Sequence, residues 1–100
     1  MPEVFSLAVI KPHDGMREEC LKILRDLYAL LGRKQYSRDV LYEDARDHSR
    51  LINFRYWSSE EARDEAHEDP DVHRLWQQLG HLCEVEQVYE RLEEVQPGQS

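Results

Sequence analysis

The apolar residues of this chain change their spacing at Gly15, and that change restricts the folds available to it. Before Gly15, the run VFSLAVI at 4–10 is rich in β-branched residues and is closed by Lys11-Pro12, which predicts a strand. Gly32 fits the left-handed position that follows a helix end. Between the two glycines, apolar residues recur every three or four positions and predict a helix with one buried face: Met16, Cys20, Ile23, Leu24, Leu27, Leu30 and Leu31.

The rest of the chain alternates between the same two periods. Two strands are expected at 33–44 and 49–57, and the S-x-x-E form of Ser58 to Glu61 predicts that a short helix begins there. Asp69-Pro70 starts a further helix, and residues 85–95 form a last strand. The order β-α-β-β-α-α-β predicts an α+β, ferredoxin-like fold whose second helix is split in two. Its four-stranded antiparallel sheet carries the helices on one face.

Length and charge limit the classes of partner. One hundred residues suit one domain, expected at 1–96, with a disordered tail at 97–100. The net charge of -8 argues against a nucleic-acid partner, and no run of apolar residues is long enough to span a membrane. The N-terminus lacks the pattern of a signal peptide. Cys20 and Cys83 fall on apolar stripes of predicted helices, which favours reduced thiols and a cytoplasmic location.

The strand 49–57 has large side chains on both faces. Leu51, Asn53, Arg55 and Trp57 alternate with Ile52, Phe54 and Tyr56, and only one of these sets can meet the helices. An exposed Ile-Phe-Tyr stripe is unusually apolar for a monomer. We therefore predict a homodimer that packs sheet to sheet through Ile52, Phe54 and Tyr56.

Several motifs together resemble the antibiotic biosynthesis monooxygenase family of the dimeric α/β-barrel superfamily. They are the Lys11-Pro12 strand exit before a helix ending at Gly32, the hairpin into YWSSEEARDEAH, and the segment PDVHRLWQQLGHL before a last strand. The resemblance covers roughly residues 4 to 95. It implies a dimeric α/β barrel, and the superfamily includes cofactor-free oxygenases, haem degraders and proteins of other roles.

The resemblance also implies a reaction that needs no metal or flavin. In the family's quinone-forming enzymes, an electron-rich substrate anion reduces dioxygen in a dry apolar pocket. An Asn four residues before the strand-end Trp is part of that site, and Asn53 and Trp57 keep this spacing. By this resemblance, the Asn53 amide would bind a substrate oxygen, the Trp57 indole N–H would bind the oxygen intermediate, and His67 or His73 would move a proton. The implied substrate is a small aromatic or quinol-type molecule.

Other residues complete the candidate site, and each also has a purely structural explanation. Arg55 shares the face of Asn53 and can bind a substrate anion or pair with a carboxylate, and the aromatic residues Tyr36, Tyr42 and Trp76 are candidate wall residues. Asn53 is unusual because strands disfavour Asn, and a buried amide must find hydrogen-bond partners. Where the quinone-forming relatives carry a Tyr after the Trp, this chain has Arg63.

Two alternatives to an oxygenase stay open. The first is a non-catalytic dimeric module that binds a small ligand or another protein. The second is a haem-binding or haem-degrading protein, for which His73 is the candidate ligand. A zinc site is not expected, because His67, His73 and His81 do not share one helical face at the spacing that zinc sites use.

Overall fold

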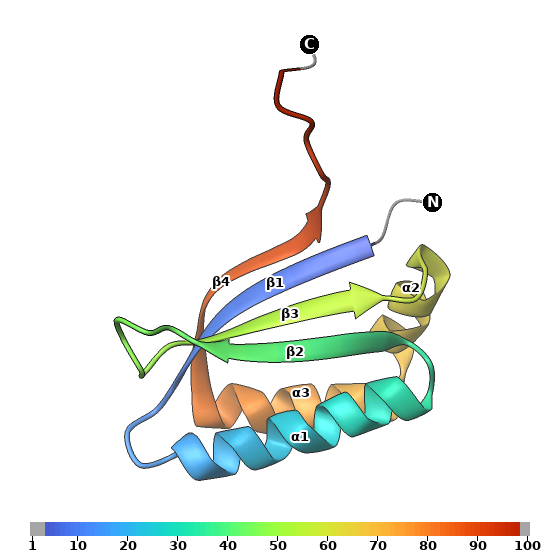
Figure 1. Cartoon of the computed structure of the whole chain (residues 1–100). Helices are drawn as coiled ribbons and strands as arrows, with labels where there is room; N and C mark the ends of the chain where they lie inside the picture. Colours follow the sequence, from blue (N-terminus) through green and yellow to red (C-terminus); the bar gives the residue numbers. More distant parts are fainter. Residues whose placement is uncertain (1–3, 99–100) are drawn as a thin grey trace.

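The structure, a computed structural model, describes residues 4–98 and has the order of strands and helices expected from the sequence (Figure 1). The elements are β1 (Val4–Pro12), α1 (Arg17–Arg33), β2 (Ser37–Glu43), β3 (Leu51–Trp57), α2 (Glu60–Glu68), α3 (Pro70–Leu82) and β4 (Cys83–Leu92). No helix in the described part of the chain is long and apolar enough to cross a membrane.

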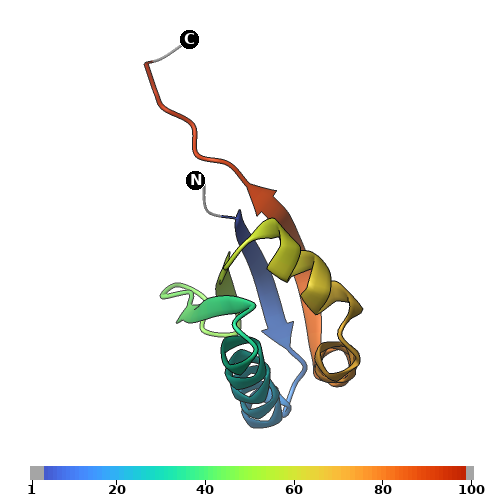
Figure 2. The same cartoon turned by 90° about the vertical axis from the view of Figure 1, so that its right-hand side faces the viewer.

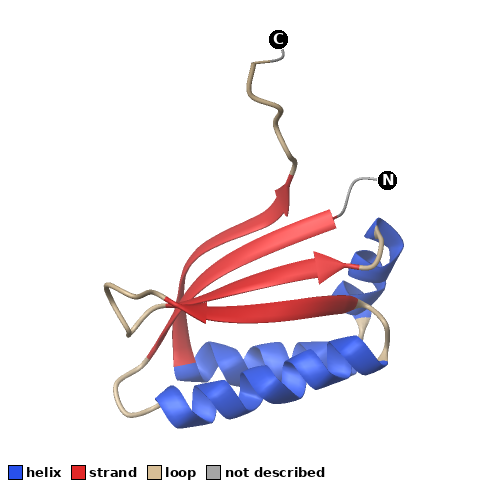
Figure 3. Cartoon of the chain, in the orientation of Figure 1, coloured by secondary structure: helices blue, strands red, loops and turns tan. Residues whose placement is uncertain are grey.

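The four strands form one sheet in the order β2-β3-β1-β4, and every neighbouring pair is antiparallel. Helices α1 and α3 lie on one face of this sheet, and α2 lies near the end at which β3 finishes (Figures 1 and 2). The opposite face carries no helix from the described residues 4–98 (Figure 3). The predicted ferredoxin-like α+β fold is therefore confirmed, and within a single chain the sheet stays open, with β2 and β4 at its edges.

The core between sheet and helices divides into two clusters. One holds Trp57 with the last turns of α1, with Ala66 of α2 and with Val72 of α3. The other holds Leu24 and Cys20 of α1, together with one residue from each of three strands: Leu51 of β3, Ile10 of β1 and Cys83 of β4. Burial of these apolar side chains is the main force that holds the helices on the sheet.

The end of α1 differs from the prediction. Gly32 lies inside the helix, which runs to Arg33, and the residue with left-handed backbone is Gln35, at φ 61°. The N–H of Tyr36 donates to the carbonyl of Leu31 at 2.8 Å, the long closing bond of a Schellman turn. The prediction of Gly32 was wrong because the chain accepts the strain of a non-glycine residue at this turn. At the other end of the helix, Met16 is an exposed cap residue and does not belong to the buried stripe.

The bounds of the later elements also differ from the predictions. The strand predicted at 33–44 spans only Ser37–Glu43, because α1 runs to Arg33 and a turn follows it, and the strand predicted at 49–57 spans Leu51–Trp57. Ser59, rather than Ser58, caps α2 by accepting from the N–H of Ala62 at 3.0 Å. Asp69 caps α3 with Pro70 in its first turn, as expected. The last strand was predicted at 85–95 but spans Cys83–Leu92, so Cys83 lies on a strand rather than on a helix. Residues 99–100 of the predicted tail lie outside the described residues.

The face of the sheet that no helix covers is aromatic. The ring of Phe5 lies 5.7 Å from that of Phe54 and 4.9 Å from that of Tyr56. Tyr42 meets Phe54 edge to face at 5.3 Å, and the Arg38 guanidinium lies 4.4 Å from the centre of the Tyr56 ring. The prediction that Phe54 and Tyr56 point away from the helices is confirmed. We call this set of side chains the outer aromatic face.

Candidate functional site

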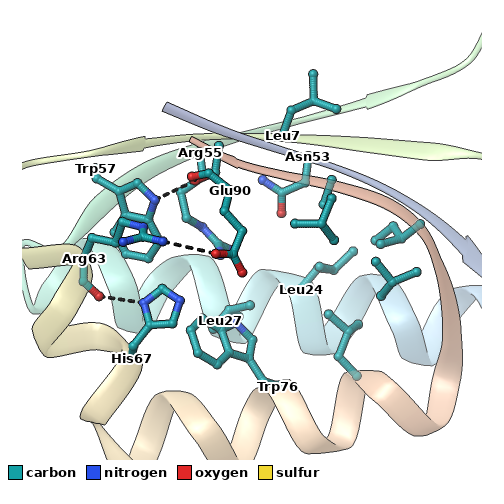
Figure 4. A pocket seen from close by; sticks show the side chains of 16 residues that line it. Leu7, Leu24, Leu27, Asn53, Arg55, Trp57, Arg63, His67, Trp76 and Glu90 are labelled. Carbon is teal, nitrogen blue, oxygen red and sulfur yellow. Dashed lines mark hydrogen bonds and ion pairs between the residues drawn. The ribbon is translucent and has the colours of Figure 1, made fainter. Parts of the chain in front are cut away.

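A cavity of about 360 Å³ lies between the sheet and the helices (Figure 4). Its volume is within the range of pockets that hold small organic ligands. Most of its wall is apolar, formed by Leu7, Ala8, Ile10, Leu24, Leu27, Trp57, Trp76, Leu79, Val85 and Val88. The charged and polar residues of the lining come from three strands and from α2: Ser6, Asn53, Arg55, Arg63, His67 and Glu90. A mostly apolar chamber with a few polar groups is the usual form of a small-molecule site.

Asn53, the only asparagine of the chain, is held in the cavity wall by two hydrogen bonds. The Tyr28 hydroxyl of α1 donates to its amide oxygen at 2.7 Å, and its Nδ2 donates to Asp39 Oδ2 at 3.1 Å. The residue is only 6% exposed, so these bonds fix the orientation of the amide. An amide nitrogen carries two N–H groups. One donates to Asp39, and no partner of the second is found within residues 4–98.

Asp39 is the centre of this buried network. Its side chain is fully buried and accepts from Arg55 Nε at 2.6 Å and from the Ser37 hydroxyl at 2.8 Å, in addition to Asn53. Asp39 lies opposite Arg55 in the register of β2 with β3, which is why the two side chains meet. Burial, followed by the nearby charge of Asp39, raises the pKa of the Tyr28 phenol. Tyr28 therefore stays protonated and acts as a donor to Asn53.

The Trp57 ring forms part of the cavity wall, but its polar atom faces the protein. The indole N–H donates to the Ser6 hydroxyl at 2.9 Å, and that hydroxyl donates to the carbonyl of Glu90 at 2.6 Å. The Arg55 guanidinium lies 5.4 Å from the centre of the Trp57 ring. The expected use of the indole N–H for an oxygen intermediate does not match this arrangement, because that N–H already has a partner.

His67 lines the cavity between two indole rings. Its ring centre is 5.9 Å from that of Trp57 and 5.2 Å from that of Trp76. Its Nδ1 lies 2.8 Å from the carbonyl oxygen of Arg63, one helical turn earlier. A carbonyl only accepts, so Nδ1 carries the proton of this bond and Nε2 of the neutral ring is left as an acceptor. An imidazole with a free Nε2 in a cavity can take a proton from a ligand.

Arg63 and Glu90 form an ion pair between α2 and the edge strand β4, and both line the cavity. Nη2 of Arg63 donates to Glu90 Oε2 at 3.2 Å (Figure 4). The Nε of the same guanidinium is buried and has no hydrogen-bond partner within residues 4–98. The Glu90 side chain is 68% exposed, so it is free to move away from Arg63.

The structure brings together five of the eight residues proposed from the sequence: Asn53, Arg55, Trp57, His67 and Trp76. His73 is exposed on α3, where its Nε2 faces the backbone carbonyl of His67 outside the lining. The Tyr36 hydroxyl donates to Asp69 Oδ2 at 2.8 Å and contributes to the core rather than to the cavity. Tyr42 belongs to the outer aromatic face, because Tyr42 and Leu41 point to opposite sides of β2. These three residues were expected at the site and do not line it.

Four residues of the site were not foreseen as parts of it. Tyr28 of α1 and Asp39 of β2 both form hydrogen bonds with Asn53, and neither belongs to a sequence motif that predicts this role. Glu90 faces the cavity because the pairing of β1 with β4 shifts register between Val9 and Ile10, which changes the alternation along β4 after Val85. Arg63 was noticed only as a departure from the quinone-forming relatives. No group of three or more His, Cys, Asp or Glu side chains within residues 4–98 is arranged to hold a metal ion.

Solved structures with the same fold are known, although their sequences have diverged. SnoaB from Streptomyces nogalater, a cofactor-independent oxygenase, is 18% identical with a TM-score of 0.79 and covers 97% of this chain and 99% of its own. Rv0793 from Mycobacterium tuberculosis is 23% identical (TM-score 0.73; 94% and 99% covered). A putative antibiotic biosynthesis monooxygenase from Chloroflexus aurantiacus is 15% identical (TM-score 0.74; 96% and 97% covered). No protein-family model matches the chain, and no curated protein matches it. The chain thus has the fold of these solved structures, which include a putative antibiotic biosynthesis monooxygenase, as the resemblance implied.

Proposed function

We propose that this protein is a cofactor-independent monooxygenase that oxidises a small phenolic or quinol-type aromatic molecule with dioxygen. The observation that carries the proposal is that a fixed amide donor, Asn53, and an imidazole acceptor, His67, line the same apolar cavity. The fold shared with SnoaB, a cofactor-independent oxygenase, supports the proposal. A flat aromatic molecule fits between apolar walls that include Trp57 and Trp76.

The proposed reaction begins with removal of a proton from the substrate by Nε2 of His67. The resulting oxyanion accepts the second Nδ2–H of Asn53, a donor that is already oriented and therefore needs no reorganisation. The electron-rich ring carbon then gives electrons to dioxygen and a carbon–oxygen bond forms. The imidazolium of His67 returns its proton to the peroxide oxygen, and the peroxide then loses water as the remaining C–H bond of that carbon breaks and a C=O bond forms. A CH₂ carbon and one O₂ thus become one carbonyl group and one water, so no outside reductant is required.

Oxygen consumption with a panel of naphthols and anthrones tests this proposal. Wild-type protein treated with chelator is compared with Asn53→Ala and His67→Ala, and circular dichroism checks that each variant is folded. We expect a rate loss of about 100-fold to 1,000-fold for Asn53→Ala, the range found when an oxyanion donor is removed. His81→Ala is the matched control for His67→Ala, because His81 lies on α3 outside the cavity lining. Equal rates in wild type and Asn53→Ala would remove the role of Asn53, and no uptake with any substrate would contradict the enzyme proposal.

A non-catalytic, ligand-binding role is the second candidate, and one observation favours it. Both ends of the Asn53 amide already have protein partners, so the residue is explained by the buried network even without a reaction. Binding of aromatic ligands without any oxygen uptake would support this role. Haem binding is less well supported, because His73 lies outside the cavity lining. A Soret shift of added haemin that His73→Ala abolishes would favour the haem alternative.

We also propose that two copies pack together through the outer aromatic face. Phe5, Phe54 and Tyr56 are only half-buried in one chain, on the face of the sheet that carries no helix within residues 4–98. A second sheet placed against these rings would remove them from water, which is favourable in proportion to the apolar area covered.

We also propose a cytoplasmic location, because a reducing compartment suits the free, buried thiols of Cys20 and Cys83.

A further inference from the structure

The Arg63 guanidinium in the cavity wall makes only part of the hydrogen bonds that it can form with a carboxylate. A guanidinium holds a carboxylate best through two parallel N–H bonds, and Nε with Nη2 forms one such edge. Arg50 shows the complete form on the surface of this chain, because its Nε and Nη2 donate to the two oxygens of Glu86 at 2.7 and 3.4 Å. In Arg63, Nη2 of the same edge donates to Glu90 at 3.2 Å, whereas Nε is buried and has no hydrogen-bond partner within residues 4–98.

An unpaired, buried N–H of a charged group is costly, so the structure favours whatever molecule satisfies it. Glu90 contacts only the Nη2 side of this edge and does not reach Nε. Glu90 lies on an edge strand and its side chain is 68% exposed, so water can solvate its carboxylate when the side chain moves away from Arg63. The other arginine of the cavity, Arg55, is already tied to the fully buried Asp39 at 2.6 Å. Arg63 is therefore the cation with an incomplete partner.

We infer that the molecule bound in this cavity is an aromatic carboxylic acid, whose carboxylate displaces Glu90 and takes the Nε–Nη2 edge of Arg63. The inference rests on the proposed function in one respect, because it assigns the ligand to the same cavity. Arg63 lies one helical turn before His67 on α2, and Figure 4 shows Asn53 on the sheet at a distance from both. The carboxylate end of the ligand is then held at the α2 side of the cavity, and the ring and its hydroxyl extend toward Asn53.

Binding of a matched ligand pair tests the inference. A naphthol and the hydroxynaphthoic acid with the same ring and hydroxyl position are titrated anaerobically at pH 7, and quenching of Trp57 and Trp76 fluorescence reports binding. Two charge-assisted bonds predict that wild type binds the acid about 10-fold to 100-fold more tightly than the naphthol. Arg63→Gln is expected to abolish this preference without weakening naphthol binding. Glu90→Gln is expected to strengthen acid binding, because the competing carboxylate is gone.

Arg50→Gln is the matched control, since it removes a similar Arg–Glu pair away from the cavity and is expected to leave both affinities unchanged. Equal affinity of wild type for acid and naphthol would overturn the inference, and so would an acid preference that survives in Arg63→Gln. The result of this binding experiment can be distinguished from the result of the oxygen-uptake experiment that tests the proposed function. An acid preference without oxygen uptake supports this inference and contradicts the oxygenase, whereas naphthol oxidation without an acid preference does the reverse.

Discussion

Asp39 is predicted to be the residue on which the candidate site depends most for its stability. Its fully buried carboxylate accepts from Arg55, Asn53 and Ser37. Asp39→Ala removes the charge partner of Arg55, whose side chain is only 14% exposed, and leaves an uncompensated cation in the wall. Breaking a buried pair from one side costs about 3–5 kcal/mol. That is a large part of the roughly 5–15 kcal/mol by which domains of this size are stable.

Urea unfolding followed by tryptophan fluorescence measures this change. The loss of unfolding free energy in Asp39→Ala should also lower the melting temperature by roughly 15 °C or more. Asp64→Ala is the matched control, because its carboxylate is 75% exposed and lies 3.7 Å from an arginine, Arg63. Such a surface pair is worth at most about 1 kcal/mol.

A double-mutant cycle separates the charge effect from lost packing. Asp39→Ala combined with Arg55→Met is expected to cost less than the sum of the two single changes, because no charge is then left unpaired. A loss below about 1 kcal/mol for Asp39→Ala, or strict additivity in the cycle, would refute the assignment of Asp39 as the buried partner of Arg55.

Three further predictions concern the turn after α1, the cap of α3 and the outer aromatic face. Gln35→Gly should stabilise the protein by up to about 1 kcal/mol, because Gln35 is left-handed at φ 61°; a loss of stability in urea would contradict this strain. Lys34 and Tyr36 hold the pKa of Asp69 at about 2, below its ordinary 3.8, so its stabilising contribution is present above about pH 4 and is lost as pH falls toward 2. Asp69→Asn keeps a capping side chain, and its unfolding free energy should therefore fall less steeply across that window than that of wild type; parallel slopes would argue against this ion pair. Phe54→Glu should convert a dimer to a monomer in light scattering at micromolar concentration, and a wild type that is already monomeric would refute the interface.

The order of elements could be predicted from the sequence because each element carries its own local signal. The period of three to four residues along 16–31 and the Asp69-Pro70 helix start need no knowledge of the rest of the chain. Their exact bounds were less predictable. Gly32 is a strong local signal for a helix end, yet the helix runs past it and the turn uses Gln35.

The network around Asn53 could not be predicted, because it depends on how elements meet rather than on any one element. Asp39 reaches Arg55 through the register of β2 with β3, which the hairpin between them fixes. Tyr28 reaches Asn53 through the rotation of α1 about its own axis, and the sequence pattern defines the apolar face of that helix only to within about a residue. The candidate residues on β3 were found because alternation along one strand places Asn53, Arg55 and Trp57 on the same face.

The most direct test of the proposed oxidation is the fate of dioxygen itself. The wild-type protein is incubated with an anthrone and with dioxygen labelled with oxygen-18, and the product is analysed by mass spectrometry. The proposed reaction places one labelled atom in the new carbonyl group and the other in water, at a rate that falls strongly in Asn53→Ala. A product without label, or labelled product formed equally fast by Asn53→Ala, would contradict the assignment of this cavity as the site of oxidation.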